Sequence, residues 1–159
     1  MKILFLVPPE TITIESSVPK MLEGGKGFYP KLGLMYVASY YEKATGNTPV
    51  FMDCPPEKYS MEEMLLRIRE VKPDLIGMSI MTFNLLDAME AAKEIKLEHP
   101  NIKICLGGPH VNLYPKETLG LPEIDYVVFG EGEPIFTKLA ITLESEGANA
   151  EKLSNINGL

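Results

Sequence analysis

The sequence predicts a protein of the α/β class built on a doubly wound parallel sheet. Short apolar runs of strand length alternate five times with longer stretches of helical periodicity. The strand runs are almost continuously apolar, which is typical of parallel strands that are covered on both faces. Right-handed crossovers between such strands place helices on both faces of the sheet.

Five runs are predicted as strands. The first covers residues 3–7 and stops at Pro8-Pro9, because proline cannot donate to a sheet ladder. The others cover 49–52, 75–81, 103–107 and 124–129. Five strand–helix units favour the flavodoxin-like, Rossmann-type order 2-1-3-4-5, in which ligands bind at the carboxyl ends of the strands.

Helix signals lie between these strands. Residues 31–44 carry an apolar face, and Ser60-Met61-Glu62-Glu63 has the form of a capping box that begins a helix over 61–71. Asn84 is predicted to cap the next helix. The last helix is predicted to begin near Pro134, since proline favours a first helical turn.

Three stretches lack a steady period. Glu10–Pro30 is a long segment rich in Thr, Ser, Gly and Pro, and long loops in compact domains are often functional. Val111–Glu123 is predicted as a loop with one helical turn after Pro115, and the residues from Gly147 onward as a tail or linker.

Composition limits the classes of function. A chain of 159 residues that is 45% hydrophobic is enough for one domain with a sizeable core. A formal charge of −7 argues against a nucleic-acid surface, which needs clustered Lys and Arg. The apolar run Met1–Val7 is too short for a secretion signal, and no other run is long enough to span a membrane. Two cysteines, Cys54 and Cys105, make no disulfide framework and fit a reducing cytoplasm.

Several familiar sites are excluded by missing residues. Pro8-Pro9-Glu10 stands where a dinucleotide fold carries G-x-G-x-x-G, and Gly24-Gly25-Lys26-Gly27 lacks the hydroxyl of a P-loop. Met81-Thr82-Phe83 stands where a phospho-receiver carries its aspartate after the third strand. The two histidines and two cysteines show no metal-ligand spacing, so no metal site is predicted on side chains.

Glycine-rich loops follow the fourth and fifth strands. These loops are Gly107-Gly108-Pro109-His110 and Gly130-Glu131-Gly132-Glu133. Adjacent strands that end in this way predict a ligand crevice at the carboxyl edge of the sheet. Simpler interpretations stay open: the glycines can be ordinary turns, Glu133 can stabilise a helix N-terminus, and His110 can be a solvated loop residue.

Four segments in order and spacing carry a resemblance to a known family: Tyr29–Leu34, Ser79–Thr82, Gly107–His110 and Gly130–Glu133. Together they resemble the N-terminal cobalamin (B12)-binding domain of B12-dependent radical SAM enzymes. These are relatives of the anaerobic magnesium-protoporphyrin IX monomethyl ester cyclase and of radical SAM methyltransferases. The resemblance covers nearly the whole chain.

The resemblance implies that the corrin ring lies across the carboxyl edge of the sheet while the nucleotide tail enters the domain. It implies that tail atoms pass close to the backbone of Gly108, so that a valine there would block binding while the fold survives. Ser79 and Thr82 would bond the base of the tail, and Glu131 and Glu133 would meet a ribose hydroxyl or an amide rather than a phosphate. The full set of implied cofactor contacts is Pro8, Pro9, Ser79, Met81, Thr82, Gly107, Gly108, His110, Gly130, Glu131 and Gly132.

The same resemblance implies a division of the parent protein. Residues 1–147 would form the cobalamin-binding domain, and 148–159 would be a linker toward a radical SAM barrel that this chain lacks. The C-x-x-x-C-x-x-C motif of that barrel is absent, and two cysteines cannot supply its three thiolates. The chain is therefore expected to catalyse nothing by itself. Its parent would use a [4Fe-4S] cluster and S-adenosylmethionine for methyl transfer or radical cyclisation.

The lower face of the cobalt is expected to carry no histidine. Domains that coordinate cobalt through histidine have D-x-H-x-x-G after the first strand, and neither His99 nor His110 lies in that pattern. We therefore expect a base-off, His-off cofactor whose lower face is covered by Glu10–Pro30 or holds water. The alternative function is a non-enzymatic flavodoxin-like sensing or interaction domain.

Overall fold

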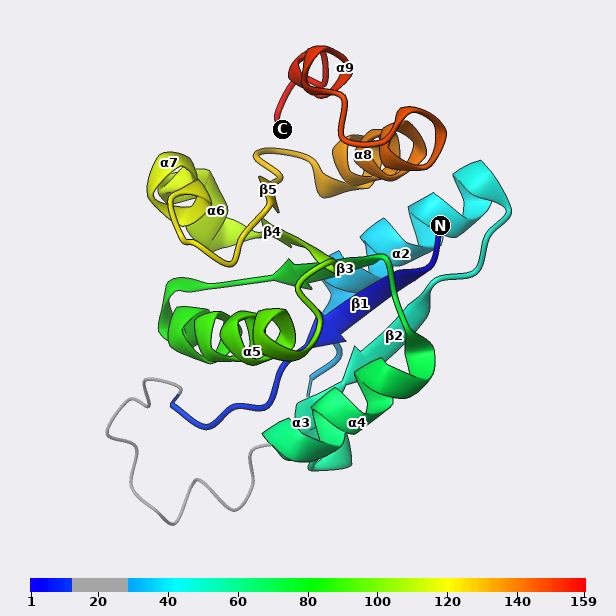
Figure 1. The fold of residues 1–159 in the computed structure, drawn as a ribbon. Coiled ribbons are helices and arrows are strands. Elements are labelled where there is room, and N and C mark those ends of the chain that lie inside the picture. Colours follow the sequence, from blue (N-terminus) through cyan, green and yellow to red (C-terminus); the bar gives the residue numbers. More distant parts are fainter. Residues whose placement is uncertain (13–28) are drawn as a thin grey trace.

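The computed structural model describes residues 1–12 and 29–159 and has the predicted doubly wound architecture (Figure 1). Five parallel strands are ordered β2-β1-β3-β4-β5, which confirms the strand order expected from the sequence. The glycine-rich stretch Gly24–Gly27 and most of the predicted loop Glu10–Pro30 lie outside the described residues. The strands are β1 (Ile3–Val7), β2 (Val50–Asp53), β3 (Leu75–Ser79), β4 (Lys103–Gly107) and β5 (Tyr126–Val127).

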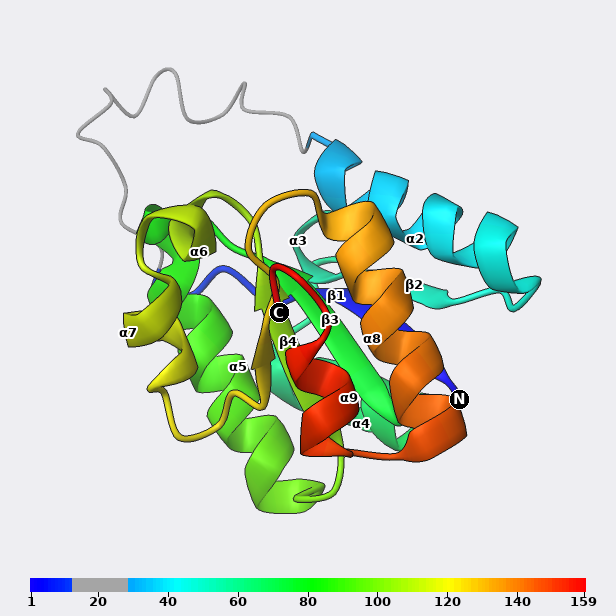
Figure 2. The same ribbon diagram turned by 90° about the horizontal axis from the view of Figure 1, so that it is seen from above.

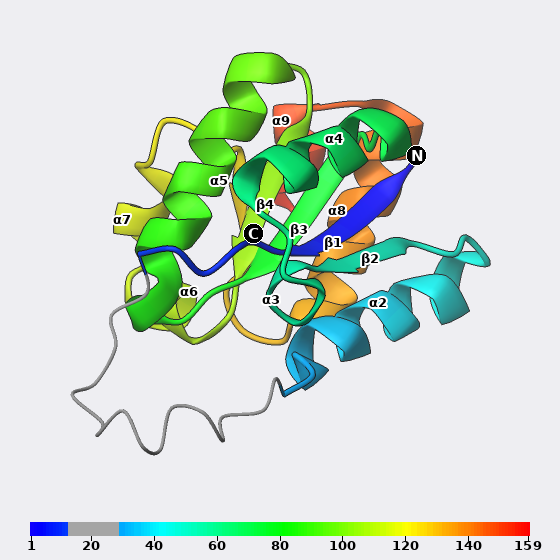
Figure 3. The same cartoon turned by 90° about the horizontal axis from the view of Figure 1, so that it is seen from below.

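The helices lie in two layers, one on each face of the sheet. Figure 2 shows α2 and α8 on one face, and Figure 3 shows α4 and α5 on the other. Shorter helical segments connect these elements near the ends of the strands. The helical elements are α2 (Leu32–Thr45), α3 (Cys54–Glu57), α4 (Met61–Val71), η1 (Thr82–Asn84), α5 (Leu85–Glu98), α6 (Pro109–Leu113), α7 (Pro115–Leu119), α8 (Gly132–Glu146) and α9 (Ala150–Ser154).

The core consists of two apolar clusters separated by the sheet. Every residue of β1 is buried, and successive side chains alternate between the faces. Leu4 and Leu6 join the cluster under α4 and α5, whereas Ile3, Phe5 and Val7 join the cluster under α2 and α8. This alternation decides which strand residues can line a site between the sheet and α8.

Of two predicted helix caps, one is confirmed and the other is not. The capping box at α4 is confirmed, since Glu63 donates its backbone N–H to Ser60 Oγ (3.2 Å) and Ser60 donates its own to Glu63 Oε2 (2.8 Å). Asn84 precedes α5 but does not cap it, because its Oδ1 accepts from the backbone N–H of Met81 (2.9 Å). Asn84 is the last residue of the 3₁₀ turn η1, which the sequence did not predict, and its side chain bonds the residue that precedes this turn.

The ends of the later elements also differ from the prediction. The third strand stops at Ser79 rather than Met81, and β5 covers only Tyr126–Val127 rather than 124–129. Beyond β5, Val128 still donates its N–H to the carbonyl of Leu106 in β4 (2.8 Å), and Phe129 donates its N–H to the carbonyl of Gly158 (2.7 Å). The last helix begins at Gly132, two residues before Pro134. The helical turn after Pro115 is confirmed as α7, and α6 is an additional helix that begins at Pro109.

Residues 148–159 fold back onto the sheet edge. Asn149 caps α9 by accepting from the N–H groups of Glu151 and Lys152 (3.1 and 3.2 Å). Ile156 is buried, and the backbone at Gly158 contacts Phe129. The segment therefore covers part of the edge next to β5. Its assignment as a linker toward a further domain stays a prediction.

A charged network fixes the amino-terminal end of the β4–β5 pair. The carboxylate of Asp125 accepts from Lys96 Nζ (2.6 Å), Lys103 Nζ (2.8 Å) and the N–H of Ile104 (2.9 Å). Burial by itself raises the pKa of Asp125, but the hydrogen bonds from Lys103, Lys96 and Ile104 outweigh it and hold the pKa below its ordinary value.

We expect Asp125→Asn to lower the free energy of unfolding at neutral pH by about 1–3 kcal/mol, because two ammonium groups lose their anionic acceptor. Since the folded-state pKa is depressed, this contribution is complete above the ordinary aspartate pKa of about 3.9. It is lost as the pH falls through the lower folded-state value. Urea unfolding of both proteins between pH 7 and pH 3 measures the difference. As a control, Glu70→Gln removes an exposed ion pair with Arg67 and should change the free energy of unfolding little. A difference in unfolding free energy between wild type and Asp125→Asn that stays constant as the pH falls would contradict this account.

Candidate functional site

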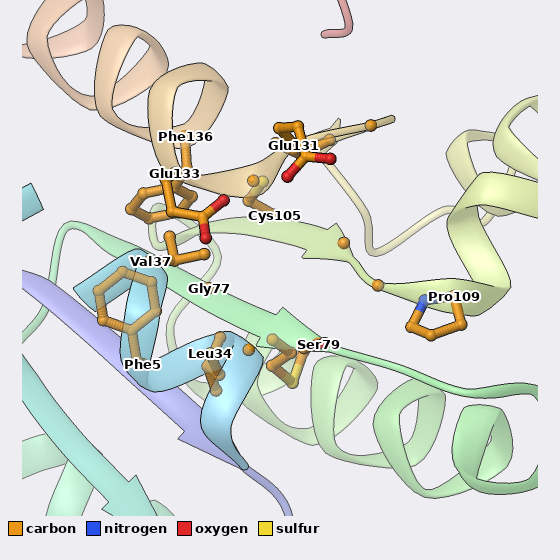
Figure 4. A pocket seen from close by; sticks show the side chains of 17 residues that line it. Phe5, Leu34, Val37, Gly77, Ser79, Cys105, Pro109, Glu131, Glu133 and Phe136 are labelled. Carbon is orange, nitrogen blue, oxygen red and sulfur yellow. The ribbon is translucent and has the colours of Figure 1, made fainter. Parts of the chain in front are cut away.

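A cavity opens at the carboxyl edge of the sheet, between the sheet and the helices α2 and α8 (Figure 4). Its volume is about 270 Å³. Residues from β1, β3 and β4 form its base, Gly33, Leu34 and Val37 of α2 form one wall, and the start of α8 forms another. This is the edge at which open parallel sheets bind ligands.

Strand register divides the cavity into a floor and a rim. Phe5, Gly77 and Cys105 are paired across β1, β3 and β4, so they lie side by side on one rung. Ser79 and Gly107 are paired two residues further along the same strands. Side chains two residues apart share a face, so the Ser79–Gly107 rung stands on the same side, about 7 Å nearer the carboxyl edge.

The floor is apolar and closely packed. The rings of Phe5 and Phe136 lie 4.9 Å apart between centroids, and a Cβ on Gly77 would stand 3.0 Å from Phe136 Cε2 and 3.1 Å from Phe5 Cδ1. Glycine at position 77 is therefore what leaves room for both rings. Burial raises the pKa of the Cys105 thiol, so this side chain stays neutral.

The rim is open at Gly107 and acidic at the start of α8. A Cβ built on Gly107 would have only Val128 within 4 Å, with its nearest atoms at 3.7 and 3.8 Å, so a side chain there would extend into free space above the floor. Figure 4 shows the carboxylates of Glu131 and Glu133 pointing from the start of α8 toward the sheet. Gly132 lets this turn approach α2, since its Cβ would stand 3.0 Å from Val37 Cγ2.

Neighbouring protein atoms lie close to Gly108 on the side where a Cβ would stand. Its φ is +98°, and a Cβ there would stand 2.6 Å from Ser79 Oγ and 2.8 Å from the carbonyl oxygen of Ile80. Ser79 Oγ and the backbone of Ile80, the residue directly after β3, therefore occupy the space that a side chain at position 108 would need. The expectation that Gly108→Val blocks cofactor binding while the fold survives stays a prediction, and the positive φ means that any side chain at this position would be strained.

Comparison with known proteins assigns the family. A sequence profile described as the B12 binding domain matches residues 22–140 of this chain. The chain belongs to the B12-binding domain family. As a B12-binding domain, it presents the cavity at the sheet edge where the resemblance in its glycine-rich loops placed a cofactor.

Relatives of this B12-binding domain are much longer proteins. An uncharacterized methyltransferase of Pyrococcus horikoshii is 33% identical over 160 residues, which is 100% of this chain and 32% of that protein. The anaerobic magnesium-protoporphyrin IX monomethyl ester cyclase of Rubrivivax gelatinosus is 31% identical over 84% of this chain and 24% of its own length. The chain thus spans a third or less of the relatives it matches.

A solved structure confirms the fold of the B12-binding domain. The cobalamin-dependent S-adenosylmethionine radical enzyme OxsB, with aqua-cobalamin bound, superposes with a TM-score of 0.71 at 17% sequence identity. The match covers 99% of this chain and 20% of OxsB. At this identity the likeness concerns the fold alone.

The cavity contains six of the residues predicted as cofactor contacts: Ser79, Gly107, Gly108, Gly130, Glu131 and Gly132. It does not contain the other five. Thr82 and His110 bond each other through Oγ1 and Nδ1 (3.0 Å), and His110 is buried in α6. Met81 is exposed beyond β3, and Pro8 and Pro9 are buried at the end of β1, where Pro9 lines a separate recess with Cys54. Contact of these five with a cofactor stays a prediction.

Sequence reasoning missed the floor. Phe5, Gly77, Cys105 and Phe136 were predicted only as parts of strands and of a helix. One signal was present, since an isolated glycine inside an apolar strand often marks a close approach by another group. Within residues 1–12 and 29–159, no cluster of three or more His, Cys, Asp or Glu side chains could hold a metal ion. Over the same residues, no helix has both the length and the apolar character that crossing a bilayer requires.

We expect Gly108→Ala to lower the free energy of unfolding by about 1–3 kcal/mol, because position 108 combines a positive φ with close contact to Ser79 Oγ and the Ile80 backbone. Gly33→Ala is the matched control, since no atom lies within 4 Å of a Cβ there and alanine favours the helix. Urea unfolding of the two variants tests the contrast. Equal stabilities would show that β3 does not constrain position 108.

Proposed function

We propose that this chain binds cobalamin with the nucleotide tail of the cofactor inserted into the cavity between the sheet and α8. The observation that carries the proposal is the open rim at Gly107 above an apolar floor. A flat ring can pack on a floor made by Phe5, Phe136 and Cys105, because these apolar side chains leave no polar group that the ring would have to bond. The volume of about 270 Å³ lies just below the range for sites of drug-sized ligands, about 300–1,000 Å³, which suits a tail rather than a whole corrinoid.

Other groups at the rim suit the polar part of a tail. Ser79 provides a hydroxyl, and Gly130 and Gly132 add no side chains of their own to the rim beside Glu131 and Glu133. The corrin ring would lie outside the cavity, across the carboxyl edge of the sheet. Cobalamin, when bound, supplies a cobalt centre that carries methyl groups or takes part in radical chemistry.

We further propose that the cofactor is bound base-off and without a histidine ligand. His99 follows α5 at the opposite edge of the sheet, and His110 is buried against Thr82 outside the cavity. These are the only two histidines in the sequence. Neither histidine is among the residues that line the cavity.

The parent protein is proposed to be a B12-dependent radical SAM methyltransferase or cyclase. The names and lengths of the relatives support this, since the chain spans 32% of one and 24% of another. Cleavage of S-adenosylmethionine is assigned to a radical SAM domain with a [4Fe-4S] cluster in the remainder of such a protein. Cys54 and Cys105 are both buried and cannot supply the three thiolates of that cluster.

We expect Gly107→Val to weaken cobalamin binding at least tenfold, because the side chain would fill the mouth of the cavity without striking the backbone. An anaerobic titration followed by visible absorption measures the affinity. Gly120→Val in the turn after α7 is the control, since it adds the same atoms at a residue that does not line the cavity. Its Cβ would stand 3.3 Å from the Glu117 carbonyl oxygen, so a thermal melt checks the fold of this variant. Wild-type affinity in a folded Gly107→Val protein would place the tail elsewhere, and no binding by the wild type would favour a sensing or interaction domain.

Electron paramagnetic resonance of the protein-bound cobalt(II) form tests the coordination. We expect no nitrogen splitting, and the same spectrum from His110→Ala. Splitting that disappears in His110→Ala would identify His110 as a ligand. Splitting that persists in the variant would show that the cofactor's own base remains coordinated, and either result would contradict the base-off, His-off state.

A further inference from the structure

The cavity carries negative charge and no positive charge among the described residues. Two carboxylates, Glu131 and Glu133, line it, and its other lining residues include no lysine, arginine or histidine. A phosphate bound in proteins usually has a cationic side chain or the N-terminus of a helix without competing acids. Here both acidic side chains stand at the N-terminal end of α8, where an anion would otherwise bind.

We propose that Glu133 is a specificity-determining residue that accepts a hydrogen bond from a neutral donor of the cofactor tail, a ribose hydroxyl, and that keeps the tail phosphate outside the cavity. The inference rests on the proposed insertion of the tail. It deepens that function by assigning which part of the tail enters.

Glu133, rather than Glu131, is assigned this role because of its surroundings. It is half-buried in the first turn of α8, and its carboxylate forms no hydrogen bond or ion pair with residues 1–12 or 29–159. It stands one helical turn before Phe136 on the same side of the helix, so it lies above the floor and inside the rim. Glu131 is exposed and precedes the helix, so it faces solvent as well as the cavity.

Hydrogen-bonding chemistry decides which part of the nucleotide tail each part of the cavity can accept. A carboxylate only accepts hydrogen bonds, so it pairs with a hydroxyl or an N–H and repels a phosphodiester. The apolar floor takes the heterocycle, the carboxylate takes a sugar hydroxyl, and the phosphate stays at the solvent side. A charge-assisted bond to a hydroxyl is stronger than a neutral one, so loss of the charge should weaken binding.

Glu133→Gln tests the proposal by the sign of its effect. If the carboxylate accepts from a ribose hydroxyl, the affinity for cobalamin falls about five- to tenfold. If phosphate occupies the cavity, removal of the charge relieves repulsion and the affinity rises. Cobinamide, which is the same corrin without phosphate, ribose and base, should bind the variant as it binds the wild type.

Glu117→Gln is the matched control, because Glu117 occupies the first turn of α7 and the substitution changes the net charge equally. It should leave both affinities unchanged, and a thermal melt of each variant checks the fold. Unchanged or raised cobalamin affinity in Glu133→Gln would overturn the proposal, as would an equal loss for cobinamide. Failure of the wild type to bind either corrinoid would instead overturn the proposed function.

Discussion

The register between β1, β3 and β4 is the constraint on which the site depends. Pairing of Phe5 with Gly77 and of Gly77 with Cys105 places three side-chain positions on one rung beneath α8. A shift of one residue in any strand would send its members to the opposite face, under α4 and α5. Such a shift along β1 would exchange Leu4 and Leu6 with Phe5 between two closely packed clusters, so the shapes of these side chains oppose it. Core packing and cavity shape are therefore set by the same pairing.

Three glycines near the cavity act in three different ways. Gly77 lets two aromatic rings meet over the sheet, and Gly108 lets the chain after β4 lie against the Ile80 backbone that follows β3. Gly107 alone leaves space that a side chain would enter from the rim. The sequence Gly107-Gly108 alone does not tell which glycine faces neighbouring protein atoms and which faces open space. That depends on the direction in which a Cβ would point from each residue. A glycine-rich loop at a sheet edge thus combines packing requirements with an opening for a ligand.

The layered sheet could be predicted from the sequence because five apolar runs and their helices obey period and handedness rules. The loops after β4 and β5 could be placed at one edge for the same reason. The floor could not be predicted, because the contact of Phe136 with Phe5 depends on the crossing of α8 over the sheet. The pairing of Thr82 with His110 was also beyond local rules, since it joins η1 to α6 across 28 residues of sequence.

The family assignment and the geometry support one account, in which the tail of cobalamin enters between the sheet and α8 and the corrin stays at the edge. The most direct measurement is a nuclear Overhauser experiment on the chain with diamagnetic cobalt(III) aqua-cobalamin. The account predicts cross-peaks between protons of the lower base and the ring protons of Phe5 and Phe136, which form the floor. Cross-peaks from the base only to residues outside the cavity, or none from a bound cofactor to either ring, would contradict it.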